Sequence, residues 1–156
     1  MLAVVGVVLR WFSLSFVVPA LIAVPATGSP APFLLSGLAT AAAGVALGRL
    51  AGRGGSEDEP LGLREAFLLL ALLWLLVPAF GALPFLIGEV DQLGRPVDAY
   101  FEAVSGFTAT GASVLADPER LDRAMQLWRQ LSHWLGGMGI IVLAIAVLPR
   151  LRVGGR

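Results

Sequence analysis

One short segment, Thr108–Ser113, has a backbone that could bind an ion. It reads Thr-Ala-Thr-Gly-Ala-Ser, so its side chains are small and none of them is ionisable. Small residues permit an extended backbone, and Gly111 can adopt a positive φ that turns its carbonyl aside. Carbonyl oxygens on such a backbone can replace the water around a cation. The candidate ion-binding strand comprises Thr108, Ala109, Thr110, Gly111, Ala112 and Ser113.

The residues before this strand predict the short helix that would position it. Asp98 is a suitable N-cap for a helix that begins near Ala99 and runs for about two and a half turns. The negative end of that helix would then point at the strand and favour a cation there. An alternative is a loop buried between two spans, whose small residues serve helix packing. The residues alone do not decide between the two.

Composition places these elements in a membrane. The chain has 156 residues, of which 57% are hydrophobic and only 14% charged, and its mean hydropathy is +0.83. Soluble domains have about 25% charged residues. The 11 basic residues balance the 11 acidic ones, so no electrostatic footprint for nucleic acid is present. We expect an all-α integral membrane protein with the lipid bilayer as its solvent.

Four apolar runs are predicted to be membrane spans; about 20 residues cross a bilayer, and the shortest of the four, Phe33–Leu47, has 15. They are Leu2–Val24, Phe33–Leu47, Ala66–Gly88 and Gln130–Pro149. Arg10 lies inside the first run and is expected to extend its charge toward one membrane face. Ala103–Ala116 is also uncharged but too short to cross, and non-helical backbone at membrane depth must be buried in protein or line water. It is therefore predicted to be re-entrant.

Arginine counts in the short loops predict the orientation. The linker Arg49–Arg64 and the tail Arg150–Arg156 each carry three arginines, whereas the turn Val24–Pro32 has none. Both termini are therefore expected in the cytoplasm. The region Glu89–Arg129 would lie outside, with four arginines against seven acids. With both termini in the cytoplasm and four membrane spans, no fifth crossing is possible. Ala103–Ala116 must therefore enter and leave the membrane at the same face.

Two longer motifs carry a resemblance to a known family. The first is Tyr100-Phe-Glu-Ala-Val-Ser-Gly-Phe-Thr-Ala-Thr-Gly-Ala-Ser-Val-Leu115, and the second is Trp128-Arg-Gln-Leu-Ser-His-Trp-Leu-Gly-Gly-Met-Gly-Ile-Ile-Val-Leu143. Together they resemble the first pore repeat of Trk-type potassium uptake proteins, in the Trk, Ktr and HKT cation transporter superfamily. The resemblance extends over nearly the whole chain.

The resemblance implies a layout of four helix–pore-loop–helix repeats around one pore, each repeat giving a quarter of the filter. In this chain it implies an N-terminal transmembrane hairpin at 1–52, a cytoplasmic linker at 53–64 and the first repeat at 65–156. Within the repeat it implies an outer helix at 66–88, a pore helix at 98–107, a filter at 108–113 and an inner helix at 130–149. Gly111 matches the family's single filter glycine.

The family pattern also sets the expected partners. Only one of four repeats is present, so we expect a fragment of a longer protein; the alternatives are that another chain or further copies supply the remaining three repeats. A cytosolic nucleotide-binding regulatory subunit is a further expected partner. The location is the bacterial plasma (inner) membrane, crossed several times.

The expected function is transport of potassium, with sodium as the alternative ion. The ion would be bound by the backbone carbonyls of Ala109, Thr110, Gly111 and Ala112, aided by the hydroxyls of Thr108 and Ser113. A non-conducting membrane subunit or an inactive truncated fragment is the alternative. An enzyme is not expected, because the spans show no paired carboxylates and no Ser/His site. No cofactor is expected, and the chain has no cysteine and one histidine.

Several other residues have a predicted structural role. Arg129 is expected to pair with Glu102 or Asp98, and Glu102 to cap or to bond backbone near the filter. We expect His133 to be a hydrogen-bonded structural histidine rather than a proton relay. Gly136, Gly137 and Gly139 are expected to permit close helix packing rather than form a hinge. Trp128 and Trp134 are expected in the interfacial aromatic belt.

Overall fold

The computed structural model describes residues 1–27, 29–52 and 62–152, and the side chains of 27, 63 and 142–152 lie outside that description. The described residues form helices joined by loops, with no β-strand among them, so the segment predicted as an ion-binding strand, Thr108–Ser113, is part of a loop. The elements are α1 (Leu2–Phe12), η1 (Ser13–Phe16), α2 (Val17–Thr27), α3 (Ala31–Ala51), α4 (Leu63–Gly81), α5 (Leu83–Ile87), η2 (Asp91–Leu93), α6 (Pro96–Phe107), η3 (Pro118–Arg120) and α7 (Arg123–Arg152). Most of the predicted linker at 53–64 falls outside the described residues.

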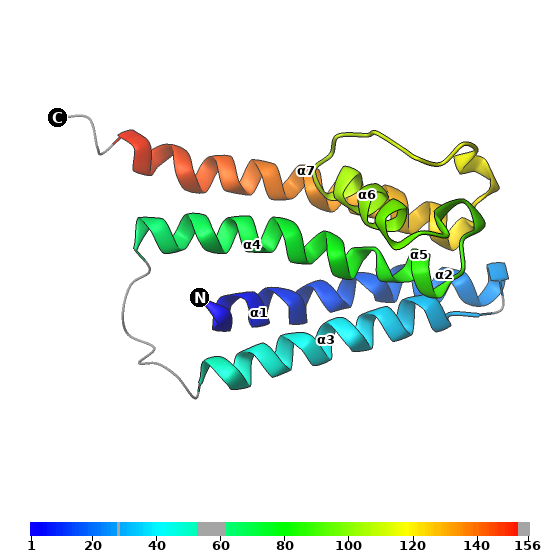
Figure 1. Cartoon of the computed structure of the whole chain (residues 1–156), viewed down its shortest axis with the longest axis horizontal. Helices are drawn as coiled ribbons and strands as arrows, with labels where there is room; N and C mark the ends of the chain where they lie inside the picture. The colour runs from blue at the N-terminus through cyan, green and yellow to red at the C-terminus, as the bar shows by residue number, and fades with distance from the viewer. Residues whose placement is uncertain (28, 53–61, 153–156) are drawn as a thin grey trace.

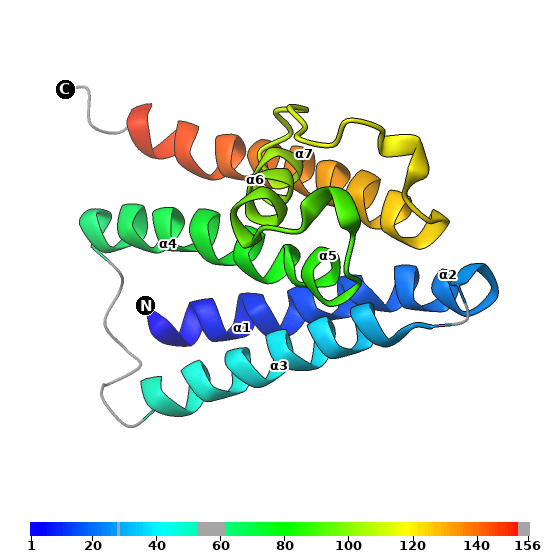
Figure 2. The same ribbon diagram turned by 45° about the vertical axis from the view of Figure 1, so that its right-hand side comes forward.

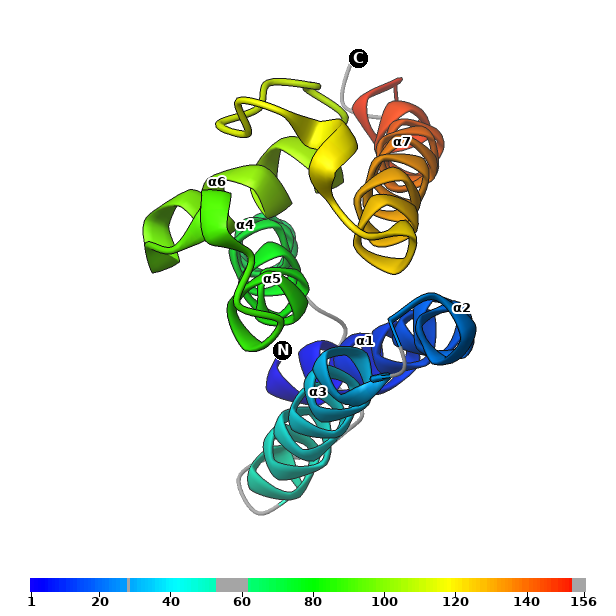
Figure 3. The same cartoon turned by 90° about the vertical axis from the view of Figure 1, so that its right-hand side faces the viewer.

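The helices run antiparallel along one axis, as Figure 1 shows. The chain begins at one end of the molecule, reaches the other end through α1 and α2, and returns along α3. It crosses again through α4 and returns along α7. Between these two crossings, α6 and the loop after it enter and leave at the same end (Figures 1 and 2). Figure 3, an end-on view, shows α1–α3 as a group beside α4–α7.

Glycines bring α1 and α3 into close contact. A methyl group added at Gly6 would lie 2.6 Å from the carbonyl oxygen of Gly44, and one at Gly44 would lie 2.8 Å from that of Gly6. Neither position therefore tolerates a side chain without a shift of backbone, which is the small-residue contact that membrane helices use.

Helix α2, which continues from α1 through η1, ends at Thr27 and includes Pro25. Pro25 was predicted to belong to the turn that follows, Val24–Pro32.

Three helical stretches are long and apolar enough to span a membrane. They are Leu2–Ala26, Ala31–Ala51 and Arg64–Ile87. The fourth predicted span, Gln130–Pro149, lies inside α7, which begins earlier, at Arg123. Because the side chains of α7 beyond residue 141 are outside the description, its membrane crossing stays a prediction.

The segment predicted as an outer helix, 66–88, is divided in the structure into two helical pieces. α4 ends at Gly81, and α5 begins at Leu83 with Pro84 in its first turn. Proline lacks a backbone N–H and fits the first turn of a helix better than its interior. Pro84 therefore starts the new helix, whereas Pro78 is accommodated inside α4.

An aromatic cluster around Trp128 joins α1, η1 and α3 to α6 and α7. The Trp128 ring is 0% exposed and lies 4.5 Å from Phe16 and 6.2 Å from Phe107, centroid to centroid. Its Nε1–H donates a hydrogen bond of 2.9 Å to the Gly81 carbonyl. The interfacial position predicted for Trp128 is therefore wrong, because its N–H finds a partner inside the core. Trp134 is 60% exposed.

Candidate ion-binding loop

Helix α6 precedes the loop and is fixed at both ends. It begins with Pro96 after an extended Arg95, so the N-cap is Arg95 and not the predicted Asp98. The Asp98 carboxylate instead accepts a hydrogen bond of 2.8 Å from Nε of Arg95. That hydrogen bond and the charge of Asp98 raise the pKa of Arg95.

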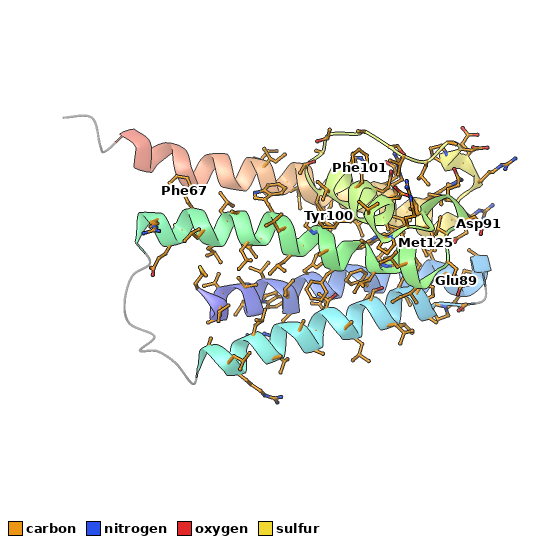
Figure 4. All side chains as sticks on the ribbon, in the orientation of Figure 1. Phe67, Glu89, Asp91, Tyr100, Phe101 and Met125 are labelled. Carbon is orange, nitrogen blue, oxygen red and sulfur yellow. The ribbon has the colours of Figure 1, made fainter. Side chains whose placement is uncertain are left out.

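Two aromatic side chains of α6, labelled in Figure 4, differ in what they contact. The Tyr100 hydroxyl donates a hydrogen bond of 3.2 Å to the Leu75 carbonyl on α4. Phe101 is 44% exposed. Phe107, at the end of the helix, is buried.

The end of α6 is a Schellman motif that turns the chain into the loop. The Ala109 N–H donates to the Gly106 carbonyl at 2.8 Å, and the Thr110 N–H donates to the Ser105 carbonyl at 2.9 Å. This pattern requires a left-handed residue after the C-cap, a position that glycine usually holds. Here Ala109 holds it, with φ +53. A non-glycine residue in this conformation costs about 1–2 kcal/mol.

Gly111 has the backbone conformation that the sequence analysis anticipated. Its φ is +78, and a side chain added there would meet nothing within 4 Å among the described atoms. Residues 109–114 are all exposed in this chain. The strand is therefore held from the α6 side only, and its other side is open.

Glu102 connects α6 to the loop and to α7. It is 1% exposed, and its carboxylate accepts hydrogen bonds from the Ser113 hydroxyl at 3.0 Å and the Val114 N–H at 3.2 Å. Nε of Arg129 donates to the same carboxylate at 2.6 Å. The predicted pairing of Arg129 is confirmed with Glu102 and not with Asp98. The predicted bond between Glu102 and backbone beside the strand is confirmed as well.

Other hydrogen bonds fix the two ends of the strand. The Ser105 hydroxyl donates to the Ala112 carbonyl at 2.5 Å, and the Thr108 hydroxyl bonds the Val104 carbonyl and the Thr110 hydroxyl, both at 2.7 Å. In contrast, the carbonyls of Ala109, Thr110 and Gly111 accept no hydrogen bond from any residue that the structure describes. Three consecutive carbonyls therefore have oxygens available to a ligand.

Helix α7 supports α6 through close glycine contacts. A side chain at Gly106 would collide with the Ser132 hydroxyl, and one at Gly136 would collide with the Phe107 carbonyl. The predicted packing role is thus confirmed for Gly136, whereas a side chain at Gly137 or Gly139 would meet no described atom within 4 Å. Nδ1 of His133 lies 2.8 Å from the Arg129 carbonyl. Because a carbonyl only accepts, this nitrogen carries the proton, as expected of a structural histidine.

Three contributors to the site were not predicted from the sequence. Ser105 was not distinguished from the other small residues of its segment. Gln92 exchanges two hydrogen bonds of 2.9 Å with the backbone of Asp117, which fixes the return of the loop. Asp122 caps α7 by accepting from the N–H groups of Ala124 and Met125. An aspartate directly before a helix is a recognisable N-cap signal, but the helix was predicted to begin only at Gln130.

Comparison with known proteins gives a family match. Residues 38–156 match the model of the TrkH family, described as a cation transport protein. The chain is 41% identical over 155 residues to the Trk system potassium uptake protein TrkH of Halomonas elongata, covering 99% of this chain and 31% of that protein. It is 48% identical over 99 residues to the Escherichia coli K12 protein of that name, covering 64% of this chain and 20% of that protein.

A solved structure is similar over the full length of the chain. The crystal structure of the potassium transporter TrkH from Vibrio parahaemolyticus superposes with a TM-score of 0.87 at 35% identity, covering 100% of this chain and 33% of that one. The chain thus spans about a third of the length of the relatives that it matches over nearly all its residues.

Proposed function

Because the chain belongs to the TrkH family of membrane cation transport proteins, we propose that it supplies one quarter of a potassium-conducting pore. Its relatives are named potassium uptake proteins, so potassium is the proposed ion and sodium the competing one. In this assignment α4 with α5 is the outer helix, α6 is the pore helix, Thr108–Ser113 is the filter strand, and α7 is the inner helix. We keep the domain boundaries that the sequence predicts: a hairpin at 1–52, a linker at 53–64 and the first repeat at 65–156.

The observation that carries the proposal is the row of carbonyls at Ala109, Thr110 and Gly111. Their oxygens have no donor within the described residues, whereas the carbonyls of Ser105, Gly106 and Ala112 each accept a hydrogen bond. A cation that has lost its water needs such oxygens, and a channel provides them from fixed backbone. The open side of this strand would face the pore axis.

The hydrogen bonds revise the roles proposed for the end of the strand. The Ala112 carbonyl accepts from Ser105, and its second lone pair is still compatible with an ion. The Ser113 hydroxyl donates to Glu102 and accepts from the Leu115 N–H. Ser113 therefore acts on the ion indirectly, by holding the strand. Thr108, bonded to Thr110 and Val104, has the same kind of role.

A single strand cannot enclose an ion, so the pore needs three further repeats. We propose that they belong to the same longer polypeptide, in accord with the length of the relatives. The chain would cross the lipid bilayer with its N-terminus and the end of α7 on the cytoplasmic side. A cytosolic nucleotide-binding subunit would regulate the assembled transporter through surfaces outside this chain.

Potassium uptake tests this function. The chain is joined to the three further repeats of a TrkH relative and expressed in cells that lack potassium uptake. Growth at low potassium and potassium uptake, measured by flame photometry, are expected to be restored. Gly111→Asp is expected to abolish uptake, because it adds a side chain at a positive φ that favours glycine and a negative charge beside the carbonyls.

The matched control is Gly94→Asp. Gly94 lies in the exposed loop after η2 and has a negative φ, so the same substitution there is expected to leave uptake unchanged. Both variants are checked for equal amounts in the membrane. Normal uptake by the Gly111→Asp protein would show that Thr108–Ser113 is not the filter.

A further inference from the structure

The hairpin carries its positive charge without any acidic residue. Residues 1–52 contain Arg10 and Arg49 and neither aspartate nor glutamate. Arg10 lies within the span Leu2–Ala26, one of the three described stretches that could cross a membrane. Neither arginine has an ion pair with any described residue. A charge at that depth requires a partner or water.

The Arg10 side chain is directed back toward the start of α1. Its Nε donates a hydrogen bond of 3.2 Å to the Gly6 carbonyl, one turn earlier. One terminal nitrogen, Nη2, lies 3.7 Å from the point where a side chain at Gly48 would begin. The guanidinium therefore reaches the last turns of α3, beside Arg49, and the absence of a side chain at Gly48 leaves room there.

These residues line two adjoining grooves. The first has a volume of about 360 Å³ and is lined by Ala3, Val7, Arg10, Val45, Gly48 and Arg49. The second, of about 460 Å³, is lined by Val7, Arg10, Trp11 and Leu14. Val7 and Arg10 belong to both, so the two form one groove that is basic at one end and apolar along α1. Trp11 is 71% exposed and Leu14 56%.

We propose that this groove binds an anionic phospholipid of the phosphatidylglycerol type. Its phosphate would lie between Arg10 and Arg49, and an acyl chain would lie along Val7, Trp11 and Leu14. A guanidinium is weakly hydrated and offers phosphate two parallel hydrogen bonds. The basic end is lined by residues of the first helix and of the last turns of α3, and the chain start and the end of α3 lie at the same end of the molecule (Figure 1), which the proposed orientation places in the cytoplasmic leaflet. This inference requires membrane insertion but not ion conduction.

The shape of the groove favours a lipid over a free anion. A small soluble anion would contact the two guanidinium groups and nothing more. The apolar part of the groove, at Val7, Trp11 and Leu14, would then remain uncovered. In a membrane protein, lipid chains cover exposed apolar surfaces of this kind. Both charge and apolar contact are matched by an amphiphilic molecule with one negative headgroup.

Native mass spectrometry of the purified, delipidated full chain tests the site. Titration with phosphatidylglycerol is expected to give one saturable bound lipid, and phosphatidylcholine of the same acyl chains is expected to bind more weakly. Arg10→Gln and Arg49→Gln are each expected to weaken phosphatidylglycerol binding about five-fold, the effect of one basic residue at an anionic membrane surface. Gly48→Leu, which fills the groove and keeps both charges, is expected to weaken it as well.

The matched control is Arg64→Gln, an exposed arginine outside the groove, which is expected to leave binding unchanged. Far-ultraviolet circular dichroism checks that every variant keeps its helices. Equal binding of the two lipids, or an equal loss on Arg64→Gln, would overturn the proposal in favour of unspecific attraction. Displacement of the lipid by millimolar inorganic phosphate would show a free-anion site and overturn it too.

Discussion

The Glu102 carboxylate lies 2.6 Å from Nε of Arg129, and it joins the two helices on either side of the candidate filter. The side chain of Glu102 is 0% exposed and that of Arg129 16% exposed, so water screens this ion pair little. The same carboxylate holds Ser113 and Val114. The position of the strand therefore depends on one acidic residue that does not itself face the ion.

The first prediction concerns that carboxylate. Glu102→Gln removes the charge and leaves Arg129 without a counter-ion, and an amide cannot accept all three hydrogen bonds. Breaking one side of a buried ion pair costs about 3 kcal/mol or more. We expect a lower midpoint of thermal unfolding in detergent, together with reduced potassium uptake in the transporter completed by three repeats.

The exposed pair on the same helix provides the control for this loss. Asp98, whose side chain is 18% exposed, bonds Arg95, whose side chain is 78% exposed. Water therefore screens this pair from the Arg95 side, and pairs that are open to water contribute little to stability. Asp98→Asn is expected to leave the unfolding midpoint and the uptake rate unchanged. Equal effects of the two substitutions would mean that the Glu102 pair does not hold the strand.

A second prediction concerns exchanging the two charges. Glu102→Arg combined with Arg129→Glu preserves an ion pair, but an arginine at 102 has no acceptor for the Ser113 hydroxyl and the Val114 N–H. We expect the double variant to recover part of the unfolding midpoint lost in either single variant and little of the uptake. Full recovery of uptake would show that the ion pair alone matters, and that the bonds to the loop do not.

Much of the fold was predictable because hydropathy and arginine placement are strong signals in a membrane protein. The apolar runs gave the long helices, and the unequal arginine content of the loops required a segment that enters and leaves at one end. The structure has α6 and its loop in that arrangement. The helix limits were less predictable: α7 starts at Arg123 rather than Gln130, because the Asp122 cap lies in a stretch that reads as polar loop.

The sequence predicted the backbone conformation at Gly111 but not the hydrogen bonds that hold the candidate site in place. Gly111 was identified because positive φ limits the choice of residue. Ala109 was not expected to share that conformation, since alanine gives no such signal and the helix end dictates it. The bond from Ser105 to Ala112 joins residues that become close only once the helix and the loop fold together.

A third prediction follows from the strain at Ala109. Its φ of +53 is unfavourable for alanine and free of cost for glycine. Ala109→Gly is expected to raise the free energy of unfolding by about 1 kcal/mol, measured as the unfolding midpoint in detergent. Ala112→Gly is the control, because Ala112 is outside the set of described positive-φ residues and glycine there only adds freedom to the unfolded chain. A lower midpoint for Ala109→Gly, equal to that of Ala112→Gly, would refute the left-handed conformation of Ala109.

The last prediction separates three glycines that look alike in the sequence. A methyl group at Gly136 would collide with the Phe107 carbonyl at the end of α6, whereas methyl groups at Gly137 and Gly139 would meet nothing within 4 Å. Gly136→Ala must therefore push α7 away from the helix that carries the strand, and such overpacking costs about 1–3 kcal/mol. Gly137→Ala only adds helix propensity, about 1 kcal/mol in favour of the folded chain. We expect opposite shifts of the unfolding midpoint, with reduced uptake for Gly136→Ala alone. Equal shifts would mean that α7 does not pack on the end of α6 through Gly136.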